Sequence, residues 1–112
     1  MSIQMLFGMI AVIFAMLLVF DTSTYWHGRN VYNEAAAEGV RVAAAFDGSC
    51  ADGIAAAEAL VRDSAGAWAR DVRVSCVDGP VVTVTVAGTT PGVLAGALGF
   101  SARVSESAPK ER

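Results

Sequence analysis

The chain has 112 residues, of which 54% are hydrophobic and 17% charged, and its mean hydropathy is +0.50. Globular domains average about 45–50% apolar and about 25% charged residues, so this chain carries an apolar excess. The net charge is −3 and no Lys/Arg cluster occurs, so the sequence is unsuited to binding nucleic acid, whose phosphates a negative surface repels. The composition also argues against an ordinary cytosolic enzyme and a disordered tail.

The apolar excess is concentrated in Ile3–Phe20, eighteen uncharged residues with Gln4 as the single amide. A helix of this length covers about 27 Å, close to the ~30 Å hydrocarbon core of a bilayer. A cleaved signal peptide would need a basic start and a small-residue cleavage site, and a soluble core helix would show a polar face. We therefore expect a transmembrane anchor over residues 1–24, followed by Tyr25 and Trp26 as interface aromatics.

The two cysteines bear on which side of the membrane the rest of the chain lies. All eight Lys/Arg residues follow the apolar run, and this distribution taken by itself favours a cytoplasmic C-terminal part. A segment of about ninety residues can nevertheless be translocated whatever its charge, so the orientation stays open. Cys50 and Cys76 form no CxxC motif and the only histidine, His27, is distant, which argues against zinc. Two interpretations remain open: two buried thiols, or one disulfide in an oxidising compartment, worth about 3–4 kcal/mol.

A helical pattern continues beyond the apolar run. Apolar or small residues recur at spacings of three and four from Val31 to Phe46, with polar residues largely on the other faces. Asp47 and Gly48 then provide a stop signal. If Thr22–Thr24 do not break the helix, we expect one helix over residues 3–46, roughly 65 Å long.

A second helix is expected from Gly53 to Ala69, with Ser49 or Asp52 as its N-cap. After it the hydrophobic period changes to two, which indicates strands. Three strands are expected, at residues 72–77, 82–87 and 100–105. Their connections are expected to be a turn at Asp78–Pro80 and a Gly/Pro-rich loop at 88–99 with a short helical turn begun by Pro91.

The predicted fold class is α+β: a long N-terminal helix extending outside the membrane, one short helix, and a small three-stranded antiparallel sheet. The helices are expected to cover one face of the sheet. Residues 25–106 would form the domain outside the membrane, and residues 107–112 a flexible tail.

No arrangement of side chains predicts chemistry. His27 is isolated next to the apolar run, and Glu34 and Glu38 share a helix face on which Arg41 can form a salt bridge with Glu38. The glycine-rich segment lacks the Lys and Ser/Thr of a phosphate-binding loop. We expect no enzymatic activity, no cofactor, no metal and no small-molecule substrate.

Small residues form two rows at helical spacing, and these are our candidates for helix packing. The first row lies in the apolar run and comprises Gly8, Ala11 and Ala15; the second lies beyond it and comprises Ala35, Gly39 and Ala43. Such rows allow helices to approach closely in lipid, although the abundance of alanine explains them equally well. Gln4 either sits among headgroups or hydrogen-bonds to a neighbouring helix or terminal amine.

The order of these features resembles the TadE-like pilus-assembly proteins, minor pilins or pseudopilins of the tight-adherence (Flp-type) secretion system. The similarity covers nearly the whole chain, and its most specific part is the pattern Ala-Ala-x-Glu-Gly-x-Arg after the apolar run. The matching stretches are Ser2–Met5, Trp26–Val31, Ala35–Arg41, 81–87 and Ser101–Ser105.

The resemblance implies a single-pass inner-membrane protein with a cytoplasmic N-terminus and a pilin-like domain outside, incorporated into or helping to initiate or cap a pilus. Its implied partners are the lipid bilayer, other pilin-like subunits and the inner-membrane assembly platform. Two features depart from the family. No basic segment precedes the apolar run, so either the start lies upstream or the chain is the cleaved form, and Gln4 stands where members commonly carry a glutamate linked to processing and charge pairing.

A second hypothesis belongs to a different class of function. In it the protein is a membrane-tethered binding module unrelated to pili, whose residues 47–105 recognise a ligand or an envelope partner while the apolar run only anchors the chain.

Overall fold

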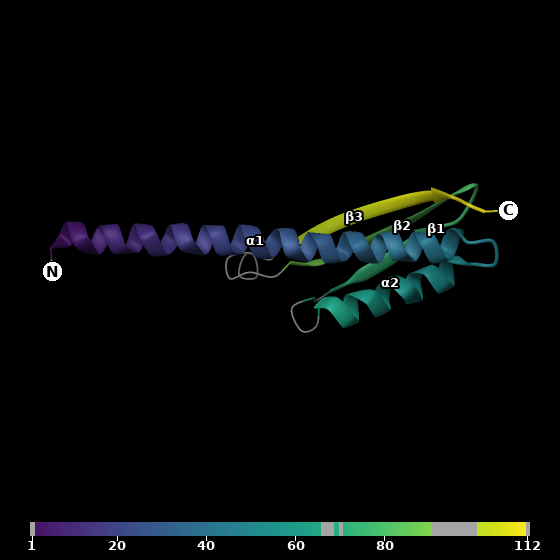
Figure 1. Ribbon diagram of the computed structural model, residues 1–112, viewed down its shortest axis with the longest axis horizontal. Coiled ribbons are helices and arrows are strands. Elements are labelled where there is room, and N and C mark those ends of the chain that lie inside the picture. Colours follow the sequence, from purple (N-terminus) through teal and green to yellow (C-terminus); the bar gives the residue numbers. More distant parts are fainter. Residues whose placement is uncertain (1, 66–68, 70, 91–100, 112) are drawn as a thin grey trace.

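The computed structural model describes residues 2–65, 69, 71–90 and 101–111. The molecule is elongated, 71 × 22 × 18 Å, and helix α1 (Ile3–Ala44) runs along most of its length (Figure 1). Helix α2 (Cys50–Ala65) turns back beside the second half of α1. Strands β1 (Arg73–Val77), β2 (Val81–Thr89) and β3 (Ser101–Pro109) form an antiparallel sheet in the order β1-β2-β3. The predicted α+β class is confirmed.

Helix α1 has two halves with different surroundings. In Ile3–Phe20, which we call the apolar segment, nearly every side chain is exposed. From Gly28 onward one face of α1 is buried, and this part of α1 together with α2 and the sheet forms what we call the head. The hydroxyls of Thr22 and Thr24 donate to carbonyl oxygens one turn earlier, so these two hydroxyls are satisfied without breaking the helix.

The close contact of α1 with α2 depends on two glycines. A Cβ atom on Gly53 would lie 2.6 Å from the Gly39 carbonyl oxygen and 2.7 Å from the Ala43 Cβ. A Cβ atom on Gly39 would lie 3.0 Å from the Gly53 carbonyl oxygen and 3.2 Å from the Ala57 Cβ. The two helix backbones therefore approach more closely than side chains on both of these residues would permit.

The sheet presents an apolar face to α1 and a polar face to solvent, as strand alternation predicts. Val82, Val84 and Val86 of β2 are completely buried on the inner face. On the outer face, hydroxyl pairs join β2 to β3, and each pair is 2.8 Å apart: Thr83 with Ser107, and Thr85 with Ser105. The helices thus cover one face of the sheet, as expected.

Tyr32 joins α1 to the end of β2. Its ring is fully buried, and its hydroxyl donates to the carbonyl oxygen of Thr89. The ring lies against Gly88, where a Cβ atom would come within 2.9 Å of the Tyr32 Cζ. Residues 88 and 89, expected in a loop, therefore continue β2, because Gly88 lets the strand pass the tyrosine. Burial raises the pKa of Tyr32 to about 12.

The expectation that the chain frays after residue 106 is wrong for residues 107–111. Strand β3 continues to Pro109, and the backbone N–H of Lys110 donates to the Pro80 carbonyl oxygen at 2.9 Å. The Lys110 ammonium donates to three carbonyl oxygens at the end of α1. One belongs to Ala43 in the last turn (2.8 Å), and two belong to residues just after the helix, Ala45 (3.0 Å) and Gly48 (2.7 Å). Carbonyl oxygens at the end of a helix are outside the regular i+4 ladder, although that of Ala45 also accepts the Gly48 N–H, and a cation is stabilising there.

Several predicted boundaries shift by a few residues. Helix α1 ends at Ala44 rather than at 46, and α2 begins at Cys50 rather than at Gly53. Of the two candidate caps of α2, Ser49 accepts the backbone N–H of Asp52 at 3.2 Å. Helix α2 was expected to reach Ala69, but it is described as helical as far as Ala65, and Ala69 is not helical. Residues 66–68, Phe100 and residues 91–99 of the predicted loop, with its turn at Pro91, lie outside the described residues.

We predict that Gly53→Ala destabilises the head by about 1–3 kcal/mol, because the added methyl group collides with Gly39 and Ala43. Denaturant unfolding of the detergent-solubilised chain measures the change. Gly8→Ala is the matched control: nothing lies within 4 Å of a Cβ there, so the same substitution is expected to leave stability unchanged or slightly raised. Equal effects of both changes would contradict the close helix contact.

A second prediction concerns alkaline pH. Because the pKa of Tyr32 is raised from 10.0 to about 12, its contribution to stability is complete below pH 10 and is lost as pH rises to about 12. The two-unit difference corresponds to about 2–3 kcal/mol in the free energy of unfolding. The free energy of unfolding, measured between pH 10 and 12, is expected to decrease with pH in the wild type and in Tyr25→Phe. In Tyr32→Phe this decrease is expected to disappear. A dependence that survives in Tyr32→Phe would refute this assignment.

Candidate membrane and assembly surface

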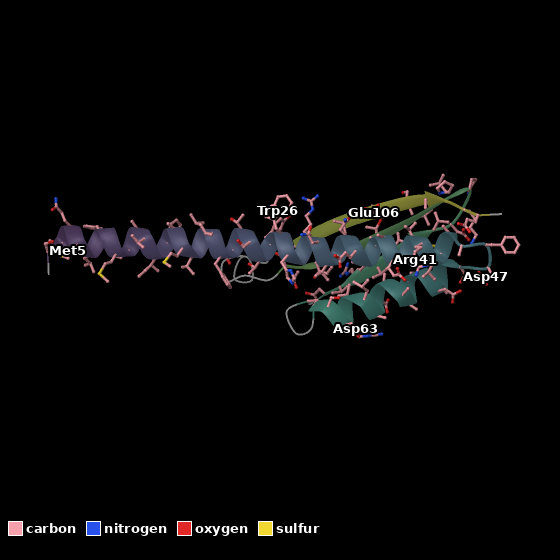
Figure 2. All side chains as sticks on the ribbon, in the orientation of Figure 1. Met5, Trp26, Arg41, Asp47, Asp63 and Glu106 are labelled. Carbon is pink, nitrogen blue, oxygen red and sulfur yellow. A yellow bond between two sulfur atoms is a disulfide. The ribbon has the colours of Figure 1, made fainter. Side chains whose placement is uncertain are left out.

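The apolar segment is the most unusual surface of the molecule. Its large hydrophobic side chains, apart from the half-buried Leu17, are 46–72% exposed, from Leu18 at the lower limit to Ile3 at the upper. Figure 2 shows side chains radiating from this part of α1, from Met5 to the level of Trp26, where the head begins. The helix is long and apolar enough to span a membrane. An apolar surface of this extent is costly in water, so it requires lipid or a protein partner.

Small residues produce two shallow apolar hollows on this segment. One lies at Gly8 and is bordered by Met5, Met9, Val12 and Ile13. The other lies at Ala15 and is bordered by Val12, Met16, Val19, Phe20 and Ser23. Hollows between larger side chains are the complement that a neighbouring helix needs for close packing.

The first row of small residues faces away from the head. Eighteen residues make about five turns of an α-helix, so residues eighteen apart lie on the same face. Counting on by eighteen from Gly8, Ala11 and Ala15 leads to Trp26, Arg29 and Asn33, which are all exposed. A second helix could therefore lie along this row and continue past the head of the same chain without colliding with it.

The second row of small residues is used inside the chain. Ala35, Gly39 and Ala43 are buried, and Gly39 and Ala43 contact α2 at Gly53. They are packing residues, but the helix that packs against them is α2 of the same molecule. Gly53 and Ala57 complete this contact from α2, and neither was predicted from the sequence to be a helix-contact residue. Their i, i+4 spacing in a helix was the available signal.

Cys50 and Cys76 are bonded to each other, with a Cα–Cα distance of 5.6 Å. The bond ties the first residue of α2 to β1, and both cysteines pack against the hydrophobic core. The alternative of two free thiols does not apply to this structure. A structural disulfide of this kind is typical of oxidising compartments.

The polar candidates in α1 do not form a reactive group. Arg41 donates to both carboxylate oxygens of Glu38, at 3.0 Å from Nε and 2.5 Å from the terminal nitrogen, and these bonds lower the pKa of the Glu38 carboxyl. Glu34, His27 and Gln4 are exposed. Across residues 2–65, 69, 71–90 and 101–111, no three His, Cys, Asp or Glu side chains gather where they could hold a metal ion.

No family model, curated protein or solved structure matches the chain, so its function is inferred from sequence and geometry.

We predict that Gly8→Leu weakens self-association of the protein in lipid vesicles by about tenfold, because the leucine fills the hollow that receives a neighbouring helix. Energy transfer between labelled copies at decreasing protein-to-lipid ratios measures this. A Cβ atom at Gly8 would meet nothing within 4 Å beyond its own turn of helix backbone, so the substitution is expected to leave the fold intact. The control Ile10→Phe adds bulk about half a turn away and is expected to have little effect. Unchanged association in Gly8→Leu would rule out this face.

Proposed function

We propose that the protein is a non-enzymatic, membrane-anchored, minor pilin-like subunit that takes part in assembling a tight-adherence (Flp-type) pilus or secretion system. The apolar segment crosses the inner membrane and packs against the corresponding helices of other pilin-like subunits. The head lies outside the cytoplasm. Assembly then proceeds through contact with the membrane platform of the system.

The observation that carries this proposal is the continuity of α1. The same 42-residue helix provides both the uncovered apolar segment and one layer of the core of the head. A simple tether needs only a flexible link between anchor and domain, whereas an unbroken helix fixes the orientation of the head relative to its neighbours in the membrane. The first row of small residues, on the face away from the head, supports lateral packing.

Two further features support the proposed location. The bond between Cys50 and Cys76 favours an oxidising compartment for the head, and hence an N-terminus on the cytoplasmic side. The resemblance to TadE-like proteins in the order of apolar run, Ala-Ala-x-Glu-Gly-x-Arg pattern and strands supports the choice of system.

A second candidate function is a membrane-tethered binding module. It is favoured by the outer face of the sheet, which is open to solvent and carries the paired hydroxyls of Thr83 with Ser107 and Thr85 with Ser105. Under this hypothesis the sheet is the functional surface, and α1 has no partner other than lipid.

One experiment separates the two functions. Replacing Ile3–Phe20 with an unrelated transmembrane sequence of equal length keeps the anchor but removes the small-residue row. We expect the chimaera to remain in the membrane after carbonate extraction, to lose co-purification with pilus components, and to fail to restore piliation in a deletion strain. A reporter after Arg112 is expected to be active only outside the cytoplasm. Restored piliation by the chimaera would refute packing through α1, and a cytosolic reporter would refute the proposed topology.

A further inference from the structure

Three Asp-Gly sequences occur in the chain, and each lies where one element gives way to the next. They are Asp47–Gly48 in the turn after α1, Asp52–Gly53 in the first turn of α2, and Asp78–Gly79 between β1 and β2. In such a sequence the glycine nitrogen attacks the preceding side-chain carboxyl more readily than elsewhere, because glycine adds no Cβ atom and restricts the backbone least. Whether the reaction occurs in a folded protein therefore depends on how each glycine is held.

At two of the three sites the glycine nitrogen is bonded to another part of the backbone. The Gly48 N–H donates to the Ala45 carbonyl oxygen at 2.9 Å, and the Gly53 N–H donates to the Ser49 carbonyl oxygen at 3.0 Å. There is no room beside either glycine, since an added Cβ atom would collide with the Val42 carbonyl oxygen at Gly48 and with α1 at Gly53. Attack at these sites requires local opening at the end of α1 or at the start of α2.

Side chains hold the same two sites. The Gly48 carbonyl oxygen accepts the Lys110 ammonium at 2.7 Å, so Lys110 fixes the turn after α1. The Asp52 carboxylate accepts the Ser49 hydroxyl at 3.0 Å, while the Ser49 side-chain oxygen accepts the Asp52 backbone N–H at 3.2 Å. The Asp52 side chain is thereby directed back toward residue 49 rather than forward to the Gly53 nitrogen.

The third site, Asp78–Gly79, has the opposite arrangement. The Gly79 N–H donates to Oδ1 of Asp78 itself at 2.9 Å, so the attacking nitrogen already lies beside the carboxyl group. Asp78 is exposed, and the turn that contains it belongs to neither strand. Apart from its chain neighbours, the nearest atom to an added Cβ on Gly79 would be the Val81 carbonyl oxygen at 3.8 Å, so the site is open.

We propose that Asp78 is a site of spontaneous isomerisation to isoaspartate, and that the fold confines the reaction to this one of the three Asp-Gly sequences. The Gly79 nitrogen forms a bond to Cγ of the protonated Asp78 carboxyl, whose hydroxyl leaves as water with the amide proton, and a succinimide ring results. Water then adds to one of the two ring carbonyls. Addition at the main-chain carbonyl leaves the nitrogen on Cγ and gives isoaspartate, and addition at Cγ restores aspartate. One water leaves and one enters, so the reaction needs no oxidant, reductant or cofactor.

The modification changes a turn on which other contacts depend. It lengthens the main chain between β1 and β2 by one methylene group, and the length of a hairpin turn sets the register of its strands. The Pro80 carbonyl oxygen in the same turn accepts the Lys110 N–H at 2.9 Å. Isoaspartate at position 78 therefore disturbs the contact that ties residue 110 to the hairpin, at the end of the head where α1 ends (Figure 1). This inference does not depend on the proposed membrane anchor or on a pilus.

Ageing of the full, detergent-solubilised chain at physiological temperature and pH tests this inference. After the disulfide is reduced, trypsin separates the sites: Asp78 lies in peptide 74–103, whereas Asp47 and Asp52 both lie in peptide 42–62. Chromatography with electron-based fragmentation then quantifies isoaspartate at each position. We expect isoaspartate to accumulate at Asp78 at least about tenfold faster than at Asp47 or Asp52, because reaction at the other two sites waits on local opening.

Two controls separate the fold from the local sequence. In the reduced chain unfolded with guanidinium chloride, the three rates are expected to agree within about threefold, because the protecting contacts are gone. Asp78→Glu keeps the charge but places the carboxyl one methylene farther away, so peptide 74–103 is expected to stay unmodified while peptide 42–62 behaves as in the wild type. Unchanged thermal unfolding of the fresh variant checks that it folds. Equal rates at all three sites in the folded chain would overturn the inference, as would the same preference for Asp78 in the unfolded chain.

Discussion

The structure depends on one close contact between helix backbones, that of α1 with α2 at Gly39 and Gly53. The contact allows a small head, with few large side chains, to bury α2 against a helix that must also continue as a straight apolar segment. With bulkier residues at these glycines, α2 would move away from α1, and the valines of β2 would lose part of their cover. The disulfide at the start of α2 and the Lys110 contacts at the end of α1 close the same end of the head around this contact.

Much of the architecture could be predicted from sequence because its signals are local. Eighteen uncharged residues define the apolar segment, a spacing of three and four identifies the buried face of α1, and alternation identifies the strands. The extension of β2 through Gly88 and of β3 to Pro109 could not be predicted in this way. Both depend on contacts distant in sequence: Tyr32 lies 57 residues from Thr89, and Lys110 lies 67 residues from Ala43.

The candidate site was predicted in part. The sequence identified both rows of small residues but not which of them would be used within the chain, because the pattern is the same in each. Only the position of α2 decides that Ala35, Gly39 and Ala43 face a helix of the same molecule while Gly8, Ala11 and Ala15 stay uncovered.

Because α1 is unbroken, a small tilt of its apolar segment becomes a large displacement of its C-terminal end. From Phe20 to Ala44 the helix extends about 36 Å, so a tilt of about 20°, ordinary for a single membrane-spanning helix, displaces Ala44 sideways by about 12 Å. Under the proposed membrane anchoring, small rotations of the apolar segment are thereby magnified at the far end of the head, where α1 ends. A protein anchored in this way would transmit a displacement within the membrane to a partner bound at that end.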